Sequence, residues 1–238
     1  MAIAVELRHI SKRFPGVIAN KDVSIKVESG SVHALIGENG AGKSTVMKIL
    51  YGMQRPDSGE ILVNGQSVQF KNPADSIEAG IGMVHQHFML ADNFTVLENI
   101  VLGYEPSHGG LIDFNAARTK INEMAAAYGL TVDPDALVED LGVGQRQRVE
   151  ILKVLYRGAK ILIFDEPTAV LVPQEVDELF EALQGLRKDG LTVIFITHKL
   201  DEVLRVADDV TVIRAGSTVA EVKASDVSAK KLAELMVG

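Results

Sequence analysis

The chain has 238 residues and a formal net charge of −8, from 24 lysines and arginines against 32 aspartates and glutamates. This balance argues against a broad surface for nucleic acid or anionic lipid, since such surfaces use Lys and Arg to neutralise phosphate charge. The lack of cysteine excludes disulfides and thiolate metal sites, and 47% hydrophobic residues allow a sizeable buried core.

The first part of the chain predicts short strands joined by turns. Apolar runs at 5–9, 23–27 and 32–36 have β character, with turn residues at Pro15-Gly16 and Ser29-Gly30. The N-terminal segment lacks the basic and long apolar parts of a leader, and no apolar run approaches the ~18 to 20 residues of a membrane span. We therefore expect any membrane role to depend on a partner.

A phosphate-binding loop follows the third of these strands. The pattern G-x-x-x-x-G-K-[ST] is met, directly before a helical run at 46–51, by Gly37-Glu38-Asn39-Gly40-Ala41-Gly42-Lys43-Ser44-Thr45. Backbone N–H groups and a helix N-terminus then face one anion, Lys43 reaches the β- and γ-phosphates, and Ser44 offers a hydroxyl to Mg²⁺. The sequence predicts binding of a nucleoside triphosphate.

The middle of the chain changes from strand to helix. A turn at 56–59 leads to a strand at 60–63, and Asn64-Gly65 predicts a hairpin to a strand at 68–70. Helical periodicity follows at 96–101 and at 115–128. A loop that contains Gly and Pro, at 104–110, lies between these two predicted helices. We therefore expect an inserted helical subdomain.

An acid pair ends the next predicted strand, which covers 161–164. Because side chains alternate along a strand, Asp165 and Glu166 can take different roles. Asp165 is expected to hold Mg²⁺, and Glu166 to polarise the attacking water as a general base.

Two further residues follow apolar runs. His198 comes just after a predicted strand at 192–196, where parallel sheets present functional side chains, and we expect it to meet the γ-phosphate. Gln86 stands where the core meets the helical insert, and its neutral amide can contact both the metal and the attacking water. The other histidines lack the spacing of a ligand set.

The rest of the chain alternates between strands and helices. A strand is expected at 210–213, with helices near 174–188 and 201–206. Such alternation predicts a parallel sheet covered on both faces.

The segment Leu141-Gly142-Val143-Gly144-Gln145 precedes a helical run at 149–156. Together with the phosphate loop and the acid pair, it resembles the ABC-type ATP-binding domain, whose signature usually reads Leu-Ser-Gly-Gly-Gln. The resemblance implies an α/β fold: a P-loop NTPase (RecA-like) core with an N-terminal antiparallel β-subdomain and an inserted α-helical subdomain. We expect one domain, with the core in 1–87 and 159–238 and the helical subdomain in 88–158.

The same resemblance implies roles for individual residues. Phe14 would stack on adenine, Gln86 would be the glutamine of the coupling loop and His198 the switch histidine. Leu171 would belong to the loop after the acid pair, and the signature would contact the nucleotide of an opposing domain. The implied cofactors are ATP and Mg²⁺, with Ser44, Gln86 and Asp165 at the metal.

A narrower likeness rests on the runs 14–20, 82–90 and 147–157, which look like the first ATP-binding half of bacterial sugar and nucleoside importers of the ribose/BMP-lipoprotein type. It implies an ATPase that powers import, with transmembrane permease subunits and a second ATP-binding domain as partners, no nucleic acid, and a cytoplasmic position at the inner face of the membrane. Those importers carry two halves in one chain, so the sequence leaves open whether this chain is a whole protein or an N-terminal half.

Two residues depart from the family pattern and keep alternatives open. Gly142 replaces a serine that usually contacts the opposing γ-phosphate, and Val172 replaces a frequent aspartate. A regulatory half-site that binds ATP but hydrolyses it poorly is one alternative, and a soluble ABC-type ATPase outside transport is another. Backbone donors of Gly144 and Gln145 are still expected to bind the anion.

Overall fold

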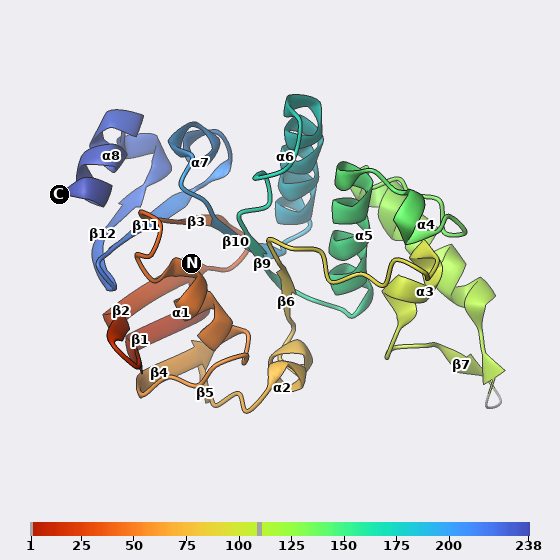
Figure 1. Ribbon diagram of the computed structural model, residues 1–238, viewed down its shortest axis with the longest axis horizontal. Coiled ribbons are helices and arrows are strands. Elements are labelled where there is room, and N and C mark those ends of the chain that lie inside the picture. Colours follow the sequence, from red (N-terminus) through yellow and green to blue (C-terminus); the bar gives the residue numbers. More distant parts are fainter. Residues whose placement is uncertain (1, 109–110) are drawn as a thin grey trace.

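The structure is a computed structural model that describes residues 2–108 and 111–238. Met1 and part of the expected loop at 104–110, namely residues 109–110, lie outside the described residues. Figure 1 shows an elongated molecule, with β1 (Ile3–Phe14), β2 (Val17–Glu28) and α8 (Ala229–Val237) toward one end and α3 (Val96–Val101) and α4 (Phe114–Tyr128) toward the other.

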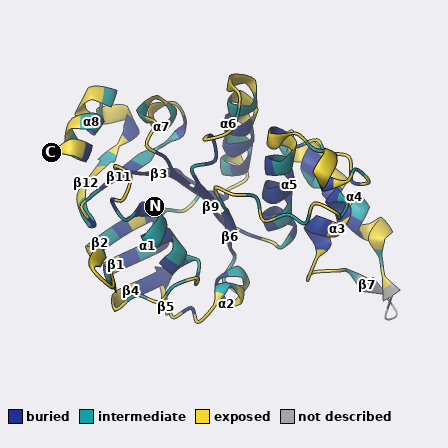
Figure 2. Ribbon diagram, viewed as in Figure 1, coloured by how far each residue is buried: buried dark blue, intermediate teal, exposed yellow. Residues whose placement is uncertain are grey.

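A six-stranded sheet forms the centre, in the order β12-β11-β3-β10-β9-β6. Its strands are β3 (Val32–Ile36), β6 (Ile81–Val84), β9 (Ile161–Asp165), β10 (Thr192–Ile196), β11 (Asp209–Arg214) and β12 (Ser217–Lys223). Five strands are parallel, as expected from the alternation of strands and helices, but β12 pairs antiparallel with β11 at the edge. Figure 2 shows the central strands as buried, consistent with apolar residues on both faces.

An antiparallel sheet lies over one face of the central sheet. It consists of β1 (Ile3–Phe14), β2 (Val17–Glu28), β4 (Ser58–Val63) and β5 (Gln66–Val68), and Asn64-Gly65 makes the predicted hairpin turn between the last two. Helix α1 (Lys43–Leu50) is packed between the sheets, because Val46 and Leu50 share a cluster with Leu7 of β1 and Ile163 of β9. The phosphate-loop helix is thereby held at the centre of the molecule.

Helices cover the opposite face. Phe164 and Phe195 of the central sheet pack with Phe180 of α6 (Pro173–Lys188), while Ile36 and Val212 pack with residues of α7 (Leu200–Val206) and α8. The first of these clusters continues into α3, α4 and α5 (Val143–Tyr156), so the expected helical insert shares a core with the central sheet.

Most predicted elements are present with longer bounds. The helix expected at 149–156 begins instead at Val143, so the signature forms its first turn. The strand expected at 68–70 lies at Gln66–Val68, and two short strands, β7 (Ser107–His108) and β8 (Leu111–Ile112), border the expected loop. The sequence pattern did not predict α2 (Pro73–Glu78), β6, β12 or α8, nor the short 3₁₀ helices Val138–Asp140 and Ala224–Asp226.

Candidate active site

The phosphate loop turns from β3 into the N-terminus of α1. Gly42 is the residue before the helix, with φ of 103° and ψ of 3°, and a Cβ there would collide with the carbonyl of Ala19. The first helical hydrogen bond is donated by Val46 N–H to Gly42 O, so the N–H groups of residues 43–45 at the start of α1 lie before the helical ladder. These N–H groups can therefore donate hydrogen bonds to an anion at the N-terminus of α1.

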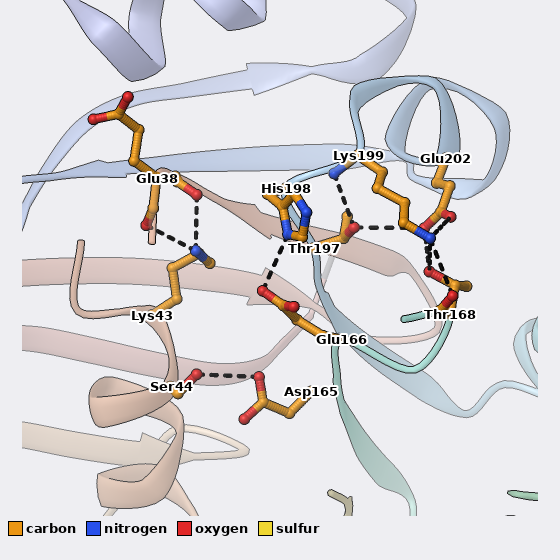
Figure 3. A network of polar contacts seen from close by, with 11 residues as sticks. Glu38, Lys43, Ser44, Asp165, Glu166, Thr168, Thr197, His198, Lys199 and Glu202 are labelled. Carbon is orange, nitrogen blue, oxygen red and sulfur yellow. Dashed lines mark hydrogen bonds and ion pairs between the residues drawn. The ribbon is translucent and has the colours of Figure 1, made fainter. Parts of the chain in front are cut away.

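Lys43 is 5% exposed and folds back on its own loop. Its Nζ donates to the carbonyl oxygens of Gly37 at 2.7 Å and Glu38 at 3.0 Å. Burial lowers the pKa of the Lys43 ammonium, while the carboxylates of Glu166 and Asp165 oppose that shift. The ammonium is therefore held by the carbonyl oxygens of its own loop, as the dashed lines in Figure 3 show.

Ser44 and Asp165 meet because of strand alternation. Ile161 and Ile163 of β9 pack on the side of α1, so Asp165, two residues further, lies on that side as well. The Ser44 hydroxyl donates to Asp165 Oδ1 at 3.2 Å. Burial raises the pKa of the Asp165 carboxyl, and the hydrogen bond from Ser44 opposes this effect.

Glu166 leaves the strand with φ of 48°, a left-handed conformation that residues other than glycine rarely adopt. This turn directs its side chain away from Asp165 and toward His198, whose Nδ1 lies 3.2 Å from Glu166 Oε1 (Figure 3). Because a carboxylate oxygen accepts, the imidazole N–H donates in this bond. The two acids thus take different directions, as the sequence predicts.

These residues have the donor set that Mg²⁺ and a triphosphate require. A hydroxyl and a carboxylate, from Ser44 and Asp165, are oxygen ligands of the kind magnesium prefers. The helix N-terminus and Lys43 supply positive charge for phosphate oxygens. The residues present therefore fit the predicted cofactors.

Two predicted residues lie apart from these contacts. Gln86 follows β6 by two residues and is exposed, and Phe14 is the last residue of β1, with 38% of its surface exposed. The Nζ of Lys12 lies 5.6 Å from the centroid of the Phe14 ring. An exposed ring beside a cation is accessible for stacking, so the expectation for Phe14 stays a prediction.

The predicted signature lies at the N-terminus of α5. Gly142 is the N-cap residue, and its N–H donates to Gln145 Oε1 at 3.0 Å. The Gly144 N–H, expected to face an anion, donates to Glu175 Oε1 of α6 at 3.2 Å. One of the expected anion donors is therefore engaged within the chain.

Sequence reasoning missed four polar residues near these groups: Glu175 beside the signature, and Thr168, Lys199 and Glu202 beside the acid pair and His198. Thr168 and Lys199 follow the carboxyl ends of two parallel strands, a position that could have singled them out. Glu175 is the third residue of α6, where a glutamate commonly caps the helix start.

The sequence profile of the family described as ABC transporter matches residues 20–169, which include the phosphate loop, the signature and the acid pair. The chain belongs to the ABC transporter family. Members of this family have an ATP-binding domain that binds ATP and ADP.

Curated relatives are importer components. The nucleoside import ATP-binding protein NupA of Lactococcus lactis subsp. cremoris is 53% identical over 234 residues, which cover 98% of this chain and 46% of that protein. The guanosine import ATP-binding protein NupO of Bacillus subtilis is 50% identical over 238 residues, which cover 100% of this chain and 47% of that protein. The chain thus spans less than half the length of these relatives.

Solved structures share the fold of the whole chain. The ADP conformation of MJ1267, an ATP-binding cassette of an ABC transporter, superposes with a TM-score of 0.86 at 27% identity and covers 100% of both chains. This similarity confirms the predicted α/β architecture. Among the helices that the structure describes, none combines the length and the apolar character needed to cross a bilayer.

Proposed function

We propose that this chain is an ATP-binding and ATP-hydrolysing domain that powers solute import through a membrane transporter. One observation carries the proposal: Ser44, at the end of the phosphate loop, donates to the first residue of the acid pair, and the second residue of the pair contacts His198. The names of NupA and NupO support the import class and a nucleoside as solute, and a glucose import relative from Haloferax volcanii supports the wider sugar class.

In the proposed reaction, the N-terminus of α1 and the Lys43 ammonium bind the phosphates of ATP. Ser44 and Asp165 would hold Mg²⁺, with Gln86 as a further ligand, and the bound ion would supply positive charge for the phosphate oxygens. Glu166 accepts a hydrogen bond from the attacking water and orients it, while His198 holds the Glu166 carboxylate. Phe14 stacks on the adenine ring.

Partners complete the proposed assembly. Two such domains close face to face, and each ATP contacts the phosphate loop of one and the signature of the other, at residues Leu141 to Gln145. The ATP-binding cassette MJ0796, which has the same fold, has been solved as a dimer bound to ADP and Pi. Permease subunits would bind the closing pair at the cytoplasmic face of the membrane, and the second domain is either an identical or a non-identical half.

A phosphate-release assay with Mg-ATP tests the proposal. We expect turnover by the parent chain, a fall of ~10² to 10⁴ in rate for Glu166→Gln with ATP binding retained, and weakened binding for Lys43→Ala. If Glu166→Gln releases phosphate at the rate of the parent chain, Glu166 is not the general base.

A second candidate is a half-site that binds ATP but turns it over poorly. It is favoured by the missing hydroxyl at Gly142 and by the engagement of the Gly144 N–H with Glu175. Saturable ATP binding without phosphate release, at chain concentrations where dimers form, would support this candidate instead.

A further inference from the structure

The loops that carry Glu166 and His198 lie side by side. Strands β9 and β10 are parallel neighbours, and Asp165 pairs in register with Ile196, so the residues after each strand leave the sheet together. The Glu166 N–H donates to Ile196 O at 3.0 Å, and this backbone contact is the first link between the two loops. Figure 3 shows a second, larger group of contacts beyond it.

That second group centres on Glu202 in the first turn of α7, whose side chain is 13% exposed. Its Oε2 accepts from the hydroxyl of Thr168 at 2.8 Å and from that of Thr197 at 3.4 Å. Its Oε1 lies 3.1 Å from Lys199 Nζ. One carboxylate therefore contacts both loops, two residues past Glu166 on one side and adjacent to His198 on the other.

Lys199 closes the group. Its Nζ donates to the carbonyl oxygen of Thr168 at 3.0 Å and to the Thr168 hydroxyl at 3.2 Å, while its own N–H donates to the Thr197 hydroxyl. The Thr168 hydroxyl thus accepts from a cation and donates to a carboxylate, and charge-assisted bonds of this kind are the strong ones. Thr168 is 2% exposed, so water competes little for its hydroxyl, although the Lys199 side chain is 41% exposed.

Such bracing matters because Glu166 is in a left-handed conformation that it would not adopt alone. A disfavoured conformation persists only where its surroundings fix it. The Glu202 group fixes the segment just after Glu166, and it also ties that segment to the loop of His198.

We propose that Glu202 is a positioning residue, which through Thr168 and Lys199 holds Glu166 and His198 in the arrangement needed to orient the attacking water. This inference rests on the proposed hydrolysis, and Glu202 itself contacts neither acid of the pair in the bonds described. Misplacement of a reacting group by about 1 Å can cost a hundredfold in rate.

Glu202→Gln tests the proposal, with Asp201→Asn as the matched control because Asp201 is an exposed carboxylate one residue earlier in the same helix. The glutamine keeps an acceptor oxygen and nearly the same shape but leaves the Lys199 cation without its counter-ion. We expect kcat to fall roughly ten- to a hundredfold with ATP affinity changed by less than about twofold, and Asp201→Asn to match the parent. Equal kcat in Glu202→Gln and Asp201→Asn would overturn the proposal.

Two additional comparisons separate positioning from loss of stability. Thr168→Val removes the hydroxyl at constant shape and should reproduce the loss of kcat, whereas Thr168→Ser keeps the hydroxyl and should restore most of it; the reverse order would overturn the proposal. In a His198→Ala background, Glu202→Gln should add less than about threefold, since both act on one group. A full additional loss would mean that Glu202 does not act through His198.

Amide hydrogen exchange without ATP gives a readout that does not depend on turnover. Glu202→Gln should raise exchange at residues 166–169 and 197–199, with no comparable change elsewhere, and Asp201→Asn should not. Unchanged exchange at both loops would overturn the proposal even if the parent chain hydrolyses ATP. If the parent chain releases no phosphate but Glu202→Gln still raises exchange at both loops, the proposed hydrolysis is refuted and the bracing role of Glu202 is retained.

Discussion

The carboxylate of Glu175 accepts a hydrogen bond from the backbone N–H of Gly144, so the first turn of α6 holds the first turn of the signature helix. The other oxygen of Glu175 accepts from the Val172 N–H at 3.1 Å. A Cβ on Gly144 would collide with this carboxylate, which shows how closely the Glu175 side chain approaches the first turn of α5. In the proposed dimer, a phosphate of the opposing ATP would compete with Glu175 for the same donor.

Glu175→Gln should therefore move two measurements in opposite directions. The melting temperature of the monomer falls, because both backbone donors lose a charged acceptor. A hydrogen bond to a charged group contributes ~1.5 to 3 kcal/mol, which is the upper limit of the loss at each donor. The ATP-dependent dimer, measured in the Glu166→Gln background, tightens, because the competitor at Gly144 is weakened. The control is Glu178→Gln, since Glu178 also links α6 to α5, through Arg148, but does not bind the Gly144 N–H. Equal dimer constants in the two variants would exclude the competition.

Val172→Thr should stabilise the chain. Val172 is the N-cap of α6, and it is 54% exposed and has no side-chain oxygen for the free N–H groups of the first turn. A threonine of the same shape adds that acceptor, for a gain of ~0.5 to 2 kcal/mol. At about 2 to 4 °C per kcal/mol for a domain of this size, Tm should rise by roughly 1 to 8 °C. Val170→Thr, an exposed valine two residues earlier, should leave Tm unchanged. Identical shifts in both variants would argue against capping.

His33 predicts a pH dependence of stability. It lies in β3 at 3% exposure, its Nε2 bonds the Thr211 hydroxyl, and burial lowers the pKa of the imidazole to about 4, against a weaker raising effect of Asp209. Because the folded-state pKa lies below the unfolded value near 6.5, the neutral ring stabilises the fold above pH 6.5. That contribution is lost as the pH falls toward 4, by about 2 kcal/mol between pH 7.5 and 5.

Urea unfolding at the two pH values measures this loss. The stability difference between the parent and His33→Gln should shrink by that amount on acidification, whatever its value at pH 7.5. His87→Gln, which replaces an exposed histidine, is the control and should show no such change. If the free energy of unfolding of the parent and of His33→Gln changes equally with pH, the pH dependence arises from groups other than His33.

Association should require ATP. Light scattering of Glu166→Gln should report a monomer without nucleotide and a dimer with Mg-ATP, because in the proposed assembly ATP supplies much of the interface. Adding Lys43→Ala should abolish the shift in mass, since that residue binds the phosphates. A dimer of equal mass in both conditions would contradict the proposed role of ATP.

The sequence predicted those functional residues that follow directly from the pattern of neighbouring residues along the chain. The acid pair could be found because Ile161 to Phe164 form a short apolar strand, and strand alternation then separates the roles of Asp165 and Glu166. The start of α5 was placed six residues too late, because the polar signature residues lack helical periodicity.

Contacts between segments that are distant in the sequence could not be predicted from local sequence patterns. Nothing in the sequence near Glu166 indicates a left-handed conformation, and the residues that it contacts, Ile196 and His198, are distant in the sequence. The engagement of the Gly144 N–H likewise depends on how α5 and α6 pack, and no local pattern specifies that. The antiparallel edge strand β12 was missed because its side chains alternate only between exposed and half-buried.

At Gly142 the chain departs from the usual signature of its family. The φ of −66° and ψ of 166° of Gly142 suit any residue, and the nearest atom to an added Cβ would be Gln145 Oε1 at 3.7 Å, so serine fits without strain. As an N-cap, serine exceeds glycine by only a few tenths of a kcal/mol, and it completes a capping box with Gln145. Monomer melting should therefore rise only slightly.

The effect across the dimer should be larger. If the signature meets the opposing ATP, Gly142→Ser in the Glu166→Gln background adds one charge-assisted hydrogen bond at each site and tightens the ATP-dependent dimer by ~1.5 to 3 kcal/mol per site. Gly142→Ala is the matched control, because it adds the Cβ without the hydroxyl and should not tighten the dimer. ATP affinity of the monomer should stay the same, since the hydroxyl acts on the partner's nucleotide. If serine and alanine give the same dimer constant with the fold intact, position 142 does not contact the opposing phosphate and the proposed placement of the signature is wrong.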